Sequence, residues 1–147
     1  MTPTPPAAER RPVVFISHSG TDTWVAEAFS EKIRALGAET FLDEENIAIG
    51  DDFDDTIRAA LERCDELVVL LTPWALKRPY LWAEVGAANL RRIPVIGVLH
   101  GLTVKDLDRK TSAPILIRRR NLIDINDFSR YLRELGERIG QGMEDSA

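Results

Sequence analysis

The stretch Val13-Val14-Phe15-Ile16, followed by Ser17-His18-Ser19-Gly20, decides the fold of this chain. Its first residues are β-branched or aromatic, with no alternation of apolar and polar positions. A run of this kind is typical of a parallel strand covered on both faces, because a strand with one face in water alternates. We therefore predict a buried parallel strand at 13–16 that ends in a polar loop.

Helical and strand patterns alternate from this strand to the end of the chain. Apolar residues recur at helical spacing between Asp22, the predicted cap, and Gly37, the predicted stop: Val25, Phe29, Ile33 and Leu36. Further strand patterns lie at 39–43, 66–72, 94–100 and 121–125. Further helical patterns lie at 53–64, from Pro79 to about Arg92, and at 128–140, where Gly140 is the predicted end. Residues 101–120 give a weak, charged pattern with at most one helical turn.

This alternation predicts an α/β fold of the flavodoxin-like type, a three-layer sandwich. Its five-stranded parallel sheet is expected in the order 2-1-3-4-5, with helices on both faces. We predict one domain at 12–140, between a flexible Pro-rich tail at 1–11 and a flexible tail at 141–147. In such sheets ligands bind outside the carboxyl ends of the strands, where the strand order reverses. The loops at 17–21 and 72–78 therefore matter most.

Composition excludes several classes of function. The chain has 147 residues, enough for one domain with its own core and too few for two ordinary ones. A net charge of -5 argues against broad binding to nucleic acid or to an acidic membrane surface. The longest apolar runs, 67–71 and 93–99, are far shorter than the roughly 20 residues of a membrane span. The single cysteine, Cys64, provides neither an internal disulfide nor a metal site, so we expect a cytoplasmic protein without a metal ion.

One carboxylate, Glu84, stands among aromatic and small residues at a predicted helix start. Tyr80 lies one turn before it and Ala88 one turn after it on the same helical face, so we expect a partly enclosed carboxylate. Two interpretations are open: a catalytic carboxylate, which we favour, and a surface glutamate that stabilises the first helical turn through the helix dipole. His18 fits a satisfied loop histidine as well as a ligand contact, and Trp82 fits the core.

Three segments in order resemble the TIR domain family, named after the Toll and interleukin-1 receptors. Phe15-Ile16-Ser17-His18-Ser19-Gly20-Thr21-Asp22 is similar to the motif of the family's first strand. Phe41-Leu42-Asp43-Glu44-Glu45-Asn46-Ile47-Ala48-Ile49-Gly50-Asp51 is similar to the second strand with its BB loop. The run 68–72 followed by 80–84 is similar to the third strand and the helix that carries the family's catalytic glutamate. The resemblance covers roughly residues 12–140.

The chain departs from the family's pattern near two of these segments. Tyr80 stands where the family usually has tryptophan, and Arg78 stands where it usually has serine. Ile49 stands where a proline often precedes the loop glycine. Tyrosine keeps an aromatic platform, whereas arginine changes how a ligand or a neighbouring subunit is contacted.

Many TIR domains cleave NAD+ between nicotinamide and ribose, giving nicotinamide and ADP-ribose or a cyclic ADP-ribose isomer, and the resemblance implies this activity here. The reaction asks little of the protein, because departure of neutral nicotinamide leaves an oxocarbenium-like ribose that nearby negative charge stabilises. The resemblance implies that Glu84 is the catalytic residue and that NAD+ is a substrate, with no cofactor. It also implies these substrate contacts: Phe15, Ser17, His18, Ser19, Gly20, Asp43 and Tyr80.

Apolar residues in the predicted BB loop suit a protein contact. The resemblance implies self-association through this loop by Ile47, Ile49, Gly50 and Asp51. No sensor or effector domain is recognisable in the sequence, so we expect a separate sensor or effector protein, or concentration, to act as the trigger. The family implies a role in antiphage defence or in virulence. The alternative is a non-catalytic interaction module that acts through the same loop.

Two other classes of protein are rejected on their residues. A phospho-accepting receiver domain shares the predicted strand order, but it needs an aspartate at the end of strand three and paired acids after strand one. This chain has Leu71-Thr72 and Ser17-His18 at those places. A glycine-rich phosphate loop is not recognisable, because Gly20 alone does not make one.

Overall fold

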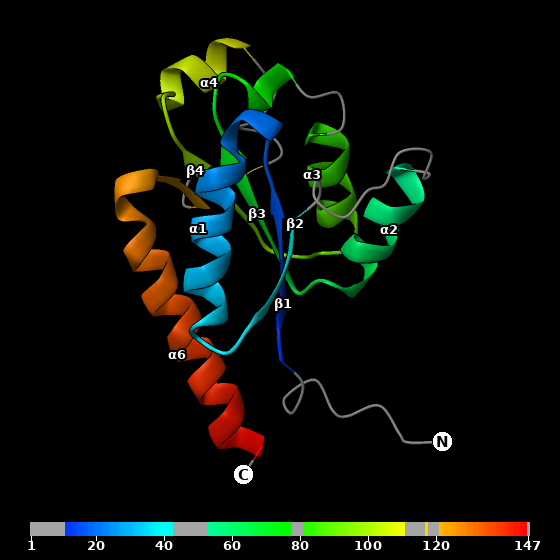
Figure 1. Ribbon diagram of the computed structural model, residues 1–147, viewed down its shortest axis with the longest axis vertical. Helices are drawn as coiled ribbons and strands as arrows, with labels where there is room; N and C mark the ends of the chain where they lie inside the picture. The colour runs from blue at the N-terminus through cyan, green and yellow to red at the C-terminus, as the bar shows by residue number, and fades with distance from the viewer. Residues whose placement is uncertain (1–10, 43–52, 78–80, 111–116, 118–120, 147) are drawn as a thin grey trace.

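Parallel strands form one five-stranded sheet in the order β2-β1-β3-β4-β5 (Figure 1). The strands are β1 (Val13–Ser17), β2 (Glu39–Leu42), β3 (Glu66–Leu71), β4 (Val95–Leu99) and β5 (Leu122–Asp124). The computed structural model describes residues 11–42, 53–77, 81–110, 117 and 121–146. The predicted flavodoxin-like fold and its strand order are confirmed.

Helices cover both faces of the sheet. On one face lie α1 (Thr23–Arg34) and α6 (Phe128–Ser146), and on the other lie α2 (Phe53–Arg63) and α3 (Leu81–Leu90) (Figure 1). The shorter elements are α4 (Val104–Lys110) and the 3-10 helices η1 (Gly20–Asp22), η2 (Ala75–Lys77) and η4 (Ile125–Asp127). Within the described ranges, no helix combines the length and the apolar character that crossing a membrane requires.

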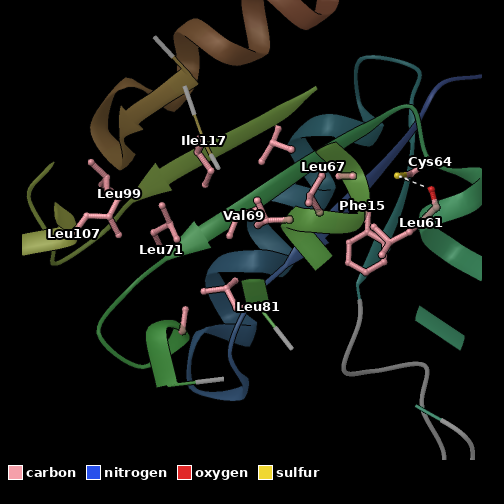
Figure 2. Packing of buried hydrophobic residues seen from close by; sticks show 14 of the residues in the cluster. Phe15, Leu61, Cys64, Leu67, Val69, Leu71, Leu81, Leu99, Leu107 and Ile117 are labelled. Atoms are coloured by element: carbon pink, nitrogen blue, oxygen red, sulfur yellow. Dashed lines mark hydrogen bonds between the residues drawn. The ribbon is translucent and has the colours of Figure 1, made fainter. Parts of the chain in front are cut away.

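The sheet separates two apolar cores. The core under α2 and α3 contains Phe15 and the odd-numbered residues of β3 (Figure 2). The core under α1 and α6 contains Ile16 and the even-numbered apolar residues of β3, and the rings of Phe29 and Phe128 stack between these helices with centroids 3.9 Å apart. All six residues of β3 are buried, which explains why its sequence shows no alternation.

Local interactions determine where α1 ends and α4 begins. Gly37 adopts a φ of +102° after α1, a conformation that glycine reaches without strain, so the predicted stop is confirmed. Before α4, Thr103 and Asp106 form a reciprocal capping box. The backbone N–H of Thr103 donates to Asp106 Oδ2 at 3.0 Å, and that of Asp106 donates to Thr103 Oγ1 at 3.2 Å. The weak charged pattern therefore contains a short helix.

One predicted helix end is wrong, and one predicted cap is correct in its position only. α6 continues through Gly140 to Ser146, because one glycine inside an otherwise favourable helix costs only about 1 kcal/mol. Asp22 does precede α1, but its side chain makes no capping hydrogen bond to that helix. The predicted strand at 121–125 is present and shorter than expected. The domain limits at 12 and 140 stay predictions.

Candidate active site

Buried polar side chains gather at the carboxyl edge of the sheet. Ser17, the last residue of β1, pairs with Val69 of β3, so the loops that follow the two strands start side by side. The buried polar residues in and after these loops are Ser17, His18, Ser19, Asp22, Thr72 and Glu84. Burying polar groups costs free energy. A cluster of them in an otherwise apolar interior is therefore typical of a functional site.

Glu84 lies on the inward face of α3. It shares one helical stripe with Leu81, Val85 and Ala88, which pack in the core below the helix, and it is itself only 2% exposed. A helix start favours negative charge, but an exposed acid would serve that purpose equally well. The burial of Glu84 therefore contradicts the interpretation as a surface glutamate, and its catalytic role stays a prediction.

Asp22 joins the two loops at this edge. Its Oδ2 accepts hydrogen bonds from Ser19 Oγ and from Thr72 Oγ1, both at 2.6 Å. Thr72 Oγ1 in turn accepts the backbone N–H of Ala75, at the start of η2, at 3.0 Å. One buried carboxylate oxygen therefore links the loop after β1 with the loop after β3, which leads to α3 and Glu84.

The predicted substrate contacts in β1 and its loop occupy different environments. Phe15 is fully buried and its ring lies against that of Phe41, with centroids 5.0 Å apart, so it has a packing role. Ser17 and His18 are fully buried at the carboxyl end of β1. The Nδ1 atom of His18 lies 3.4 Å from the carbonyl oxygen of Ile16, which is long for a hydrogen bond.

The next two residues of this loop have defined hydrogen bonds. The hydroxyl of Ser19 donates to Asp22, so it serves the loop itself. Gly20 is exposed, and its carbonyl accepts the hydroxyl of Thr23 at 2.9 Å. Substrate contacts by these residues stay predictions.

Several predicted site residues lie outside the described residues: Asp43, Ile47, Ile49, Gly50, Asp51, Arg78 and Tyr80. Their roles in substrate binding and assembly stay predictions. Trp82 is partly buried and packs against the core under α3, as the core interpretation predicts.

Sequence reasoning missed Asp22 and Thr72 as members of this edge. An aspartate before a helix has the same sequence signature whether it caps the helix or hydrogen bonds elsewhere. The signal that was available is topological, because the predicted strand order places the ends of β1 and β3 next to each other. A polar side chain after each end is then expected to meet the other.

Known proteins provide an independent comparison. The TIR domain family matches the chain over residues 14–138. A protein of Brachypodium distachyon named "Probable 2' cyclic ADP-D-ribose synthase BdTIR" is 28% identical over 101 residues, which are 67% of this chain and 45% of that protein. The chain therefore spans less than half the length of this relative.

Solved structures share the fold at low sequence identity. The TIR domain of the Toll-related receptor TRR-2 from Hydra magnipapillata has a TM-score of 0.66 at 18% identity, covering 86% of this chain and 96% of that one. The TIR domains of the activated Roq1 resistosome have a TM-score of 0.58 at 15% identity, covering 88% of this chain and 84% of that one. The match over residues 14–138 and the shared fold show that the chain belongs to the TIR domain family.

Proposed function

We propose that this protein is an NAD+ glycohydrolase that cleaves the bond between nicotinamide and ribose. The observation that carries the proposal is Glu84, a carboxylate only 2% exposed on the inward stripe of α3. It follows β3 at the edge of a parallel sheet where ligands bind. The Brachypodium relative, named as a probable synthase of a cyclic ADP-ribose, supports this class of chemistry.

In the proposed reaction the bond between ribose C1′ and the nicotinamide nitrogen breaks, and its electron pair leaves with neutral nicotinamide. The ribose becomes an oxocarbenium-like cation. The carboxylate of Glu84 binds the ribose hydroxyls and stabilises this cation, more strongly in a buried site than in water. Attack by water gives ADP-ribose and a proton, and attack by a nucleophile of the same molecule gives a cyclic isomer.

A non-catalytic interaction module is the second candidate function. Three large apolar side chains are exposed in the described part of the chain: Trp24 at 80%, Trp74 at 49% and Leu90 at 87%. They lie in α1, in the loop after β3 and at the last residue of α3, and such side chains favour a protein contact only where they form a continuous patch. Self-association is compatible with both candidates, and the Roq1 TIR domains belong to an activated assembly.

Turnover of NAD+ by purified protein at high concentration tests the proposal, with nicotinamide and both ADP-ribose products separated by chromatography. We expect Glu84→Gln to lower turnover by at least about 100-fold, because it removes the charge that stabilises the cation. Glu62, an exposed glutamate of α2, provides the matched control, and Glu62→Gln is expected to keep turnover within about twofold.

Circular dichroism checks that every variant is folded. Equal turnover by the wild type and Glu84→Gln would exclude Glu84 as the catalytic residue. A folded wild type that releases no nicotinamide at any protein concentration would favour the interaction module.

A further inference from the structure

We propose that Asp22 is a positioning residue that couples the β1 loop (residues 18–22) to the β3 loop (residues 72–77). This coupling holds the two loops, which flank the candidate site, in a fixed position relative to each other. Its effect on turnover rests on the proposed function, whereas the coupling itself is measurable without any turnover.

The hydrogen bonds of Asp22 show that its side chain connects distant segments. A capping aspartate accepts the N–H groups of its own helix, and Asp22 does not do so for α1. Instead its Oδ2 accepts one hydroxyl from its own loop, Ser19, and one from Thr72, which is 50 residues away in the chain. The contact is therefore a tertiary link made by one buried carboxylate oxygen.

Thr72 connects Asp22 to the start of η2 through a second hydrogen bond. Its hydroxyl has one proton, which it donates to Asp22, so its oxygen accepts the N–H of Ala75. The carbonyl of Thr72 also accepts the N–H of Leu76 at 3.2 Å. The direction of the turn that precedes α3 thus depends on the hydroxyl that Asp22 binds.

A contact between two hydroxyl groups lies away from the loops of the candidate site. Ser30 and Thr40 join their hydroxyls at 2.6 Å between α1 and β2. Thr40 pairs with Val14, three residues before the end of β1, which is about 10 Å from Ser17 along the strand. The Ser30–Thr40 pair is therefore a matched control: it is also a hydrogen bond made by a threonine hydroxyl, and it lies away from the carboxyl ends of β1 and β3.

Amide hydrogen exchange tests the coupling in the folded protein. Thr72→Val removes the hydroxyl and keeps the branched shape, and we expect exchange in the β1 loop to speed up by about tenfold. Thr40→Val is expected to leave exchange in that loop within about twofold of the wild type. Unchanged exchange in the β1 loop of Thr72→Val would overturn the coupling.

Steady-state kinetics with NAD+ test the positioning role. We expect Thr72→Val to lower kcat by about 10- to 100-fold, because small misplacements of reacting groups are costly, while KM changes by less than about threefold. Thr72→Ser restores the hydroxyl and is expected to restore most of kcat. An equal loss of kcat in Thr40→Val, or no rescue by Thr72→Ser, would reduce Asp22 to a purely structural residue and overturn the role.

The two experiments separate failure of the inference from failure of the proposed function. A wild type without NAD+ turnover removes the proposed reaction, and the exchange measurement still decides whether Asp22 couples the loops. Coupled exchange together with an unchanged kcat in Thr72→Val contradicts the positioning role alone.

Discussion

Cys64 follows the last residue of α2 and is buried, with its thiol donating to the carbonyl of Leu61 at 3.3 Å. Burial, and then the neighbouring carboxylate of Asp65, raises the pKa of the thiol from 9.0 to about 11. The folded protein therefore holds this proton more tightly than the unfolded chain does.

This pKa shift predicts a loss of stability at high pH. The stabilisation by the protonated thiol is complete below pH 9 and is lost as the pH rises from 9.0 to about 11, because the unfolded chain releases its proton first. We expect the free energy of unfolding to fall by about 1 to 2 kcal/mol more in the wild type than in Cys64→Ala across this window. Urea unfolding at several pH values measures the difference, and parallel pH profiles would contradict it.

The chemistry of single residues was only partly predictable. Glu84 was recognisable because its spacing from Ala88 and its small neighbours place it on a stripe that a core residue would normally fill. The Asp22–Thr72 contact was not recognisable from local sequence, because nothing local specifies a hydrogen bond between side chains 50 residues apart. The strand order was needed to bring them together.

Among the elements, α6 is fastened to the sheet through Glu66, the first residue of β3. The hydroxyl of Tyr131 donates to Glu66 Oε2 at 2.6 Å, and the guanidinium of Arg138 pairs with Oε1. Burial, and then the charge of Glu66, raises the pKa of the Tyr131 hydroxyl, so the hydroxyl stays protonated as the donor.

Removal of this hydroxyl is expected to destabilise the domain. Tyr131→Phe keeps the ring and leaves a carboxylate oxygen without its donor, so we expect a loss of about 1.5 to 3 kcal/mol in the free energy of unfolding. Arg133→Met, at an exposed position of the same helix, is the control and is expected to change it by less than about 0.5 kcal/mol. Chemical denaturation measures both, and equal effects would show that the bond to Glu66 does not fasten α6.

Replacing glycine by alanine is expected to stabilise the protein in α3 and to destabilise it in β4. A Cβ at Gly86 would meet nothing within 4 Å, so Gly86→Ala should stabilise α3 by about 0.5 to 1 kcal/mol. A Cβ at Gly97 would lie 2.7 Å from Leu122 Cδ2 and 3.0 Å from Leu71 Cδ1, so Gly97→Ala should cost about 1 to 2 kcal/mol. Thermal unfolding compares the two variants, and a stabilised Gly97→Ala would show that both leucines move aside freely.

Strands were easier to predict than helix ends. Apart from Ser17 and Glu66, β1 and β3 are apolar without alternation because both of their faces are buried, and this pattern is visible in the sequence. The start of α4 depends on a capping box inside a charged segment, and α6 continues through Gly140, where a glycine predicts a helix end. The capping box is a short motif that a charged segment obscures, and a glycine near a helix end has the same sequence signature whether it ends the helix or lies within it.

For the whole molecule, the proposed activity and the predicted self-association together give a concentration dependence that can be tested. We predict that nicotinamide release per protein molecule rises with protein concentration, as expected if one protomer completes the site of another. Ile47→Asp, in the predicted BB loop outside the described residues, should lower this activity at least about tenfold and change the melting temperature by less than about 2 °C. Light scattering alongside the NAD+ assay checks whether activity follows self-association. Nicotinamide release per protein molecule that stays constant as the concentration rises, with an unchanged oligomeric state, would contradict the prediction.

Before the sheet forms, β3 is an unprotected apolar segment in the newly made chain. Residues 67–71 contain no charge and no proline, a composition that is prone to intermolecular strand pairing. One of its two neighbours in the native sheet, β1, is far away in the chain, as the 52-residue separation of Val13 and Asp65 shows, and such pairings form slowly. Glu66 places a charge beside this segment, so the residue that fastens β3 to α6 in the finished domain also opposes intermolecular strand pairing during synthesis.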